Sequence, residues 1–191
     1  NNCKIFYYNI NDKNVYFDLG ELINLPNTSN TQPHITTHKN QNALYFVSDR
    51  PGGKGGLDIW VSVMGINGNF GSPLNLGLKI NSLADDVTPY YNKWTEELYF
   101  SSNKDEKVFN VYKSLGKINK WKESVKEESL SSSEDDLYVY FVKNNKGYFS
   151  SNRGDTSCCM NNYSFTFNSP KQIKIDNRIK LDFLPLNLYF H

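Results

Sequence analysis

The 191-residue sequence predicts an all-β fold, and three observations support this prediction. Tyr (13) and Phe (12) together number 25, while Ala occurs only twice, so strand formers far outnumber the best helix former. Asn occurs 26 times, which favours turns between short strands. The third observation is an internal repeat, which is the first pattern to look for in a chain of this kind.

The repeat is clearest in three segments that place two aromatic residues before serine, a polar residue and a basic residue. These segments are 44–50, 98–104 and 147–153, and Tyr45, Tyr99 and Tyr148 are spaced by 54 and 49 residues. A second run of alternating apolar residues follows each segment, at 58–62, 110–114 and 162–166. Two such runs joined by turn residues predict a pair of antiparallel strands.

Further apolar segments flank each pair of runs. They precede it at 31–35, 87–90 and 137–140, and they follow it at Phe70 with 73–76 and at Trp121 with 123–125. The pattern predicts about four short strands in each unit. Repeats of roughly 40 to 50 residues with four strands are typical of a β-propeller blade, which packs against neighbouring blades.

The expected units begin with the C-terminal half of a blade at 1–30, because 4–8 occupies the place of a third strand. Blades are expected at 31–82, 83–130 and 131–168, with an exit segment at 169–191 leading to a following domain. Three and a half blades cannot close the usual ring of about 4 to 8. We therefore expect a portion of a longer protein with further blades, and an open unit of three to four blades is the alternative.

The repeated residues are expected to have structural roles. Glycines between Arg50 and Asp58 suit a turn, because glycine supplies positive φ and close backbone approach. The turn lacks the Gly-Lys-Ser/Thr ending of a phosphate-binding loop. The structural repeat motif comprises Tyr45, Phe46, Ser48, Asp49, Arg50, Gly52, Gly53, Gly55, Gly56, Asp58, Trp60, Tyr99, Phe100, Ser102, Asn103, Tyr148, Phe149, Ser151, Asn152 and Arg153.

Catalytic and metal-binding patterns are not expected from the acidic and histidine residues. Asp58 has Asn110 and Asn162 at the matching places, which favours a turn anchor over a catalytic acid. The adjacent aspartates at 85–86 and 135–136 lack the spaced ligands of a calcium loop. His34 and His38 are four residues apart on a predicted strand and loop, where this spacing does not form a zinc pair. No catalytic residue, metal or cofactor is therefore predicted.

The three cysteines leave several pairings open. Cys158 and Cys159 are adjacent and Cys3 is distant, so one thiol stays unpaired within this chain if the compartment is oxidising. A vicinal disulfide, a bridge from one of the pair to a distant cysteine, and two buried thiols are all compatible with the sequence. We expect a structural disulfide that involves Cys158 or Cys159.

Charge and hydropathy do not favour nucleic acid, anionic lipid or a membrane span. The 21 basic and 20 acidic residues give a net charge of +1, so no general field attracts nucleic acid or anionic lipid. No apolar run approaches the roughly 18 residues that span a bilayer. The chain does not open with a charged and then apolar signal segment.

Residues 44–60 resemble the WD40-like PD40 propeller repeat, as do 73–77 with 80–81, and 147–153 followed by the cysteine pair. The resemblance covers about residues 3–168. It implies a Gram-negative cell-envelope protein whose propeller lies between a tetratricopeptide region and a peptidoglycan-binding domain of the outer-membrane-protein-A type. Such proteins are linked to type IX secretion and gliding, and the TolB propeller is a more distant relative. Residues 104–107 depart from the family's glycine-rich turn, and 160–162 depart from its acidic pattern.

The expected function is a non-catalytic scaffold for protein–protein interaction, in the periplasm or at the periplasmic face of the outer membrane. Its expected partners are envelope proteins, with peptidoglycan bound only through a domain outside this chain. The alternative is a glycan-binding or glycan-hydrolysing propeller. Hydrolysis would require two facing carboxylates roughly 5 to 9.5 Å apart, and the candidates are Asp58, Asp85, Asp86, Asp135 and Asp155.

Overall fold

The computed structural model describes residues 2–8, 15–154 and 159–168, and the backbone of 172–176. All regular elements within these residues are strands, so the all-β prediction is confirmed. They are β1 (Phe6–Tyr8), β2 (Tyr16–Asp18), β3 (Asn30–His38), β4 (Gln41–Ser48), β5 (Asp58–Val63), β6 (Leu74–Asn75), β7 (Asp86–Asn92), β8 (Glu97–Ser102), β9 (Asn110–Lys117), β10 (Lys120–Trp121), β11 (Val125–Lys126), β12 (Asp136–Lys143), β13 (Lys146–Ser151), β14 (Asn161–Asn168) and β15 (Gln172–Asp176).

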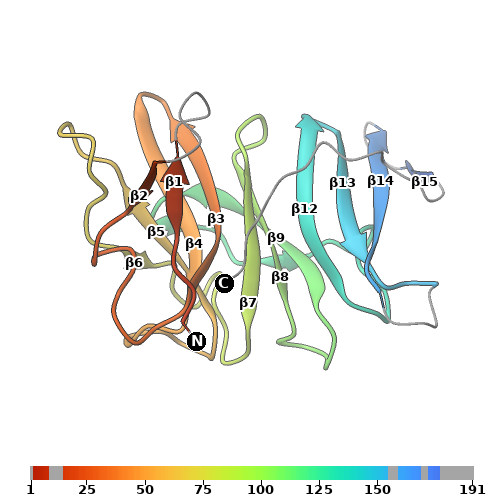
Figure 1. Cartoon of the computed structure of the whole chain (residues 1–191). Helices are drawn as coiled ribbons and strands as arrows, with labels where there is room; N and C mark the ends of the chain where they lie inside the picture. The colour runs from red at the N-terminus through yellow and green to blue at the C-terminus, as the bar shows by residue number, and fades with distance from the viewer. Residues whose placement is uncertain (1, 9–14, 155–158, 169–171, 177–191) are drawn as a thin grey trace.

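The strands form one small and three larger antiparallel sheets. β1 and β2 make the N-terminal sheet, and β3-β4-β5-β6 make sheet 1. Sheet 2 has the order β7-β8-β9-β10, with β11 also paired to β9, and sheet 3 has the order β12-β13-β14-β15. Figure 1 shows sheets 1, 2 and 3 standing side by side in chain order. Each larger sheet is built by adding consecutive strands, and each added strand runs antiparallel to its neighbour.

The outermost strands differ most from the sequence expectation. In sheet 2, β10 pairs with the end of β9 while β11 pairs with its middle. In sheet 3, β15 pairs with β14, so the sheet continues past residue 168, where the sequence placed the end of the unit. Phe70 lies before β6 and makes an isolated bridge with Met64.

The register of the second and third strands corrects one predicted equivalence. Ser48 pairs with Asp58, Ser102 pairs with Asn110, and Ser151 pairs with Asn161. Asn161 is therefore the counterpart of Asp58, and the assignment of Asn162 to that place was wrong by one residue. Two consecutive asparagines made both alignments plausible, and a shift of one residue moves a side chain to the other face of the sheet.

The apolar core lies between consecutive sheets, because side chains alternate between the two faces of each strand. Ile5 and Ile23 pack with Phe46 and Trp60, between the N-terminal sheet and sheet 1. A larger cluster joins sheets 1 and 2, and its members include Tyr45, Val47, Ile59, Val61, Tyr91, Phe100 and Trp121. Sheets 2 and 3 share a cluster that includes Tyr99, Val111, Val139, Phe141, Phe149, Tyr163 and Phe165.

A side-chain clip recurs where the chain passes from one sheet to the next. The Asn81 side chain accepts a hydrogen bond from the Ile59 amide and donates one to the Ile59 carbonyl, both at 2.9 Å. Asn24 makes the same two bonds to Ile5 at 2.8 Å. Each asparagine thereby pairs with a main-chain segment as another strand would, which satisfies buried polar groups of the third strand.

Candidate functional site

The basic residue of each repeat motif lies at a junction between sheets. Arg50 is buried and donates to the carbonyls of Leu22 and Ile23 at 2.9 and 2.5 Å, and to Asn30 Oδ1 at 2.7 Å. Its guanidinium carbon is 4.7 Å from the centroid of the Phe46 ring. Burial lowers the pKa of Arg50 to about 10, which leaves it charged at neutral pH. This side chain connects β3 to the loop before it.

Arg153 repeats the arrangement in sheet 3. Its Nη2 donates to the Leu130 carbonyl at 2.7 Å and to Asp136 Oδ1 at 2.5 Å, and its guanidinium carbon lies 4.7 Å from the Phe149 ring centroid. Asp136 stands at the start of β12, as Asn30 does at the start of β3. The shared position of the two arginines therefore reflects the same contact between a loop and a first strand.

Sheet 2 has Lys104 at this position, and its contact differs. Lys104 Nζ bonds Ser124 Oγ at 2.9 Å and lies 4.0 Å from the centroid of the Tyr112 ring. Asp86 Oδ1, the counterpart of the oxygen bound by Arg153, has no hydrogen-bond partner among the described residues. Asp86 is fully buried, and this burial raises its pKa.

Lys104→Arg is expected to stabilise the chain by about 1 kcal/mol, because the longer forked side chain can reach Asp86 Oδ1. The measurement is the free energy of unfolding in urea at neutral pH. The same change in a chain that carries Asp86→Asn serves as the control and should bring a smaller gain. Equal gains in both backgrounds would contradict a role for the Asp86 carboxylate.

The polar residue between the serine and the basic residue of each motif accepts a bond from a backbone amide. The three pairs are Asp49 with Ser29 at 2.7 Å, Asn103 with Asp85 at 2.9 Å, and Asn152 with Asp135 at 2.9 Å. The donating residue immediately precedes the first strand of the same sheet. Each motif therefore holds the start of the first strand beside the end of the second.

Two aspartates extend these connections to the preceding sheet. Asp85 Oδ1 accepts the amide of Leu57, and Asp135 Oδ1 accepts that of Phe109, each at 2.8 Å. The backbone amide of Asp86 donates to the carbonyl of Leu57, and that of Asp136 donates to the carbonyl of Phe109, each at 2.7 Å. The adjacent aspartates of the sequence thus join consecutive sheets.

The glycine-rich turn is anchored by Asp58. Its carboxylate accepts the amides of Lys54 and Gly55 at 2.5 and 3.0 Å, and the Asn75 side chain at 2.6 Å. Gly52 has φ +92°, a conformation that favours glycine. A Cβ atom on Gly55 would lie 2.0 Å from the Ala84 carbonyl oxygen, so the turn packs directly on the loop that enters sheet 2.

The aspartates that were candidates for a glycan-hydrolysing site accept hydrogen bonds from groups of the chain itself. Asp58, Asp85 and Asp135 accept backbone amides, and Asp86 Oδ2 accepts the Ser82 amide and hydroxyl. Asp155 lies outside the described residues. So does Cys158, and the disulfide expected at the cysteine pair therefore stays a prediction. Cys3 is half-buried.

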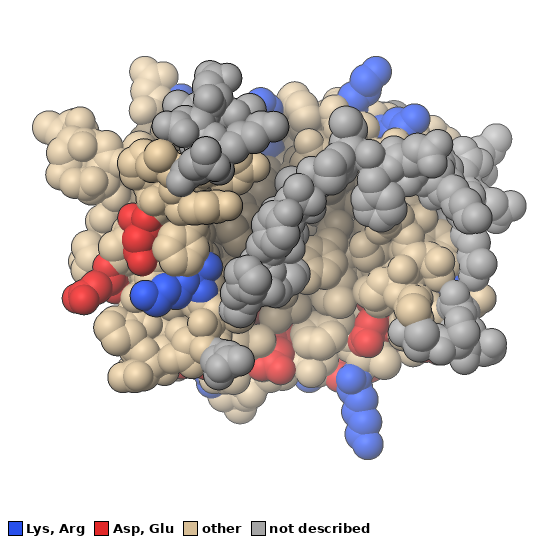
Figure 2. Space-filling model, in the orientation of Figure 1, with Lys and Arg blue, Asp and Glu red and all other residues tan. Residues whose placement is uncertain are grey.

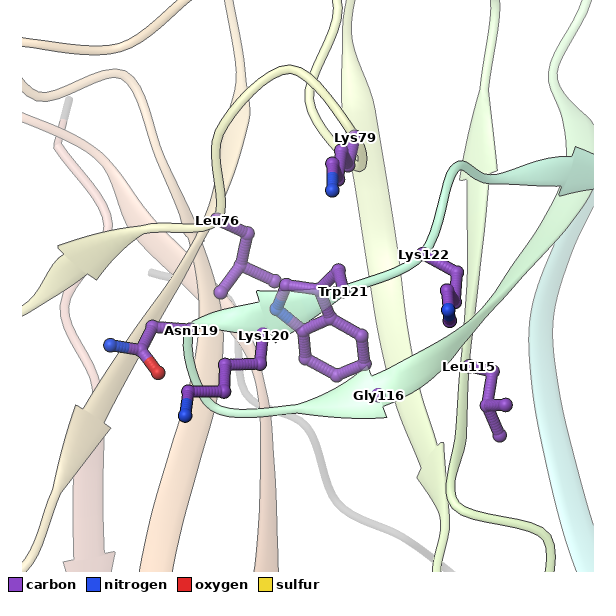
Figure 3. Close-up of a pocket in the computed structure, with 8 residues that line it drawn as sticks. All are labelled: Leu76, Lys79, Leu115, Gly116, Asn119, Lys120, Trp121 and Lys122. Carbon is purple, nitrogen blue, oxygen red and sulfur yellow. The ribbon is translucent and has the colours of Figure 1, made fainter.

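A pocket of about 570 Å³ opens between sheets 1 and 2 (Figure 3). Residues from the end of sheet 1 meet the hairpin formed by β9 and β10. The lining residues are Leu76, Lys79, Leu115, Gly116, Asn119, Lys120, Trp121 and Lys122. In Figure 3 the Trp121 indole lies centrally, between Leu76 on one side and Leu115 on the other.

The hairpin below this pocket is held by specific contacts. Trp121 Nε1 donates to the Ile118 carbonyl at 2.9 Å, and the Ile118 amide donates to Tyr45 Oη at 3.1 Å. The Trp121 ring packs edge-on against Tyr45 and Tyr91, with centroids 6.1 and 6.3 Å away. A Cβ on Gly116 would lie 2.1 Å from the Lys120 carbonyl oxygen, so only glycine allows β10 this close. The β9–β10 hairpin that lines the pocket therefore contacts sheet 1 through Tyr45.

The charge of the pocket is locally positive. Its lining contains three lysines and no carboxylate, and the side chains of Lys79, Lys120 and Lys122 are exposed. Elsewhere the charges are mixed, and Figure 2 shows basic and acidic residues interspersed over the face in view. None of the sequence patterns predicts a site at this place. The available signal was the segment 117–122, in which lysines flank a tryptophan.

His34 and His38 lie in β3 on the side that meets sheet 2. The His34 ring centroid is 4.6 Å from that of Tyr90, while His38 Nε2 lies 2.9 Å from Tyr45 Oη. Burial lowers the pKa of His34 from 6.5 to about 4, and burial also lowers that of His38. Both side chains are therefore held in packed surroundings that favour the neutral ring.

Stability is expected to fall as the pH drops from about 6.5 to about 4, because the unfolded chain binds a proton at His34 that the folded chain does not. The shift corresponds to a loss of up to about 3 kcal/mol. Urea unfolding at several pH values measures it. His34→Gln should unfold with a shallower pH dependence over this interval, and an unchanged dependence would contradict the assignment.

Comparisons with protein-family models and with curated proteins find no match for this chain. In the described part of the chain, no helix is long and apolar enough to cross a membrane. Within the same residues, no group of three or more His, Cys, Asp or Glu side chains is arranged to hold a metal ion.

Proposed function

We propose that the chain is an arc of a β-propeller that acts as a non-catalytic platform for protein–protein interaction. The repeated strand order and the recurring contacts between sheets support the propeller interpretation. The resemblance to PD40 repeats supports a place in the bacterial envelope, in the periplasm or at the periplasmic face of the outer membrane. Assembly with a secretion or motility complex associated with peptidoglycan fits the same resemblance.

The observation that carries this proposal is the contrast between the motif residues and the pocket. The charged motif residues are engaged in internal bonds: Arg50 bonds the loop before β3, and Asp58 anchors the glycine-rich turn. The pocket instead presents exposed lysines around apolar side chains, and its Trp121 is hydrogen-bonded within the hairpin. Apolar anchors beside a charged rim are the usual composition of a protein-binding surface. The partner segment is expected to carry acidic and apolar side chains.

A photo-crosslinking amino acid at Leu115 tests the proposal, because this residue lines the pocket and half of its surface is exposed. The full-length protein is irradiated in envelope extracts of its source cells, and crosslinked proteins are identified by mass spectrometry. We expect a discrete partner, and Lys120→Glu with Lys122→Glu should reduce its yield several-fold. Lys54→Glu changes an exposed lysine outside the pocket and serves as the control.

Two results would count against the proposed function. One is the absence of any crosslinked partner. The other is a yield that falls equally with Lys54→Glu, which would indicate a general effect of charge.

A further inference from the structure

The edge strand β10 leaves main-chain groups of sheet 2 unpaired beside the pocket. β10 stands at the end of the strand order and pairs only with β9 among the described strands. The Lys122 amide donates to the Leu115 carbonyl of β9 at 2.9 Å. The direction of main-chain groups alternates along an antiparallel strand. The amide and carbonyl of Trp121, the preceding residue, therefore point away from β9.

The pocket follows this edge of β10. Lys120, Trp121 and Lys122 are consecutive, and all three line the pocket. Because successive side chains of a strand point to opposite faces, a space that meets all three extends along the edge between those faces. Figure 3 shows the lysine side chains placed around the Trp121 indole, with Leu76 on one side. The space therefore suits an extended segment that lies beside β10.

The lysines of the pocket differ from other lysines of sheet 2, which form ion pairs with nearby carboxylates. These pairs are Lys113 with Glu127 at 2.6 Å, Lys126 with Glu106 at 2.8 Å, and Lys117 with Glu96 at 3.7 Å. The three pocket lysines form no ion pair within the described part of the chain. Their positive charges are therefore uncompensated, and they favour an occupant that carries carboxylates.

The spacing of two lysines determines where the carboxylates must stand. Lys120 and Lys122 are two residues apart and both pair with β9, so their side chains share one face while Trp121 occupies the other. Side chains directly opposite each other on paired strands are in contact. Successive acidic, apolar and acidic residues would thus meet the two lysines and the tryptophan. Lysines at a sheet edge disfavour pairing with a neutral strand, so the acidic residues provide selectivity.

The 191-residue sequence does not itself contain a triplet of this kind. Among its 20 acidic residues, only Glu134 and Asp136 are two positions apart, and the residue between them is Asp135 rather than an apolar residue. Asp136 is also buried and bonded to Arg153. Neither a second copy of the chain nor any of its own segments can therefore supply the triplet, so the occupant is a segment of a partner protein.

On the basis of the proposed function, we propose that the β10 edge binds an extended acidic–apolar–acidic segment of a partner protein as an additional antiparallel strand of sheet 2. Trp121 exchanges two main-chain hydrogen bonds with the apolar residue of the segment. The flanking carboxylates meet Lys120 and Lys122, and the apolar side chain lies beside Leu76. Main-chain bonds provide affinity in this mode, and the side chains at alternate positions provide specificity.

A short peptide of Gly, Ser and Thr with one central Glu-Leu-Glu triplet tests the proposal in an NMR titration of the whole isotopically labelled 191-residue chain. We expect saturable shifts of the backbone amides at 119–123 and of the Trp121 indole N–H. Methylation of the leucine amide nitrogen should weaken binding about tenfold, because that N–H donates to the Trp121 carbonyl. Methylation of the following glutamate amide is the matched control, since that group points away from β10.

Charge reversal tests the two lysines. Lys120→Glu with Lys122→Glu should remove binding of the Glu-Leu-Glu peptide and create binding of a Lys-Leu-Lys peptide. Lys54→Glu with Lys93→Glu makes the same change of net charge at exposed residues outside the pocket. This control should alter the affinity for the Glu-Leu-Glu peptide by no more than about twofold, because distant exposed charges are screened by salt. Thermal unfolding confirms that both variants are folded.

Absence of saturable binding, equal binding of a peptide with the order Glu-Glu-Leu, or equal effects of the two methylated peptides would overturn the proposal. A partner that is crosslinked at Leu115 but is not displaced by the Glu-Leu-Glu peptide would also overturn it, while the platform function would stand. Binding of the peptide without any crosslinked partner would instead contradict the proposed function and support the assignment of the β10 edge.

Discussion

Arg50→Ala is expected to lower the free energy of unfolding by about 2 to 4 kcal/mol, because each buried acceptor that loses its donor costs about 1 to 3 kcal/mol. The substitution leaves the carbonyls of Leu22 and Ile23 and the side chain of Asn30 without their donor. It also removes the cation from the faces of Phe46 and Trp60. Urea unfolding followed by circular dichroism measures the loss.

Lys54→Ala is the control for this change, since Lys54 is an exposed residue of the adjacent turn. It should alter the unfolding free energy by no more than about 0.5 kcal/mol. Arg50→Lys should recover only part of the loss, because an ammonium group cannot donate to carbonyls in the fixed fork of a guanidinium. Full recovery with lysine would show that charge alone matters at this junction.

Gly55→Ala is expected to destabilise the chain by about 2 to 4 kcal/mol through steric overlap. The added Cβ would lie 2.0 Å from the Ala84 carbonyl oxygen, 2.8 Å from that of Ser82 and 2.9 Å from the Leu83 carbonyl carbon. All three are backbone atoms, so no flexible side chain can move aside. Thermal and urea unfolding of the variant test this expectation.

Gly68→Ala separates steric overlap from backbone strain. Gly68 has φ +80° but open space around the position of a Cβ atom. Alanine there should cost only about 1 kcal/mol, from the left-handed conformation alone. Similar losses at the two positions would contradict close packing between the glycine-rich turn and the loop that enters sheet 2.

The repeated polar residues explain why the aromatic strands form consecutive sheets. Strands with two apolar faces could slide or pair in several registers. Bonds from Arg50 and Arg153 to first strands, together with the Asn81 clip, fix one arrangement. With lysine at the arginine position, Asp86 Oδ1 lacks the guanidinium bond that Asp136 Oδ1 receives from Arg153.

Much of the fold was predictable because strand signals are local. The runs at 44–50 and 98–104 contain the alternation of β4 and β8, and turn residues separate them from the following strands. The equivalence of Asn162 failed because adjacent asparagines have the same local preference. Only the pairing of Ser151 with Asn161 distinguishes them.

The sequence by itself determined the strand content, the repeat and the place of the motif residues at turns, since each depends on neighbours along the chain. The tertiary structure decided which distant groups meet. Leu76 and Lys79 join Trp121 at one pocket, and Ile5 receives from Asn24 the same two bonds that Ile59 receives from Asn81. Such contacts depend on how separate sheets pack, and no local pattern encodes them. The aromatic surplus could be counted from the sequence, but only packing left Phe6, Tyr8 and Tyr16 exposed while burying Phe46 and Phe100.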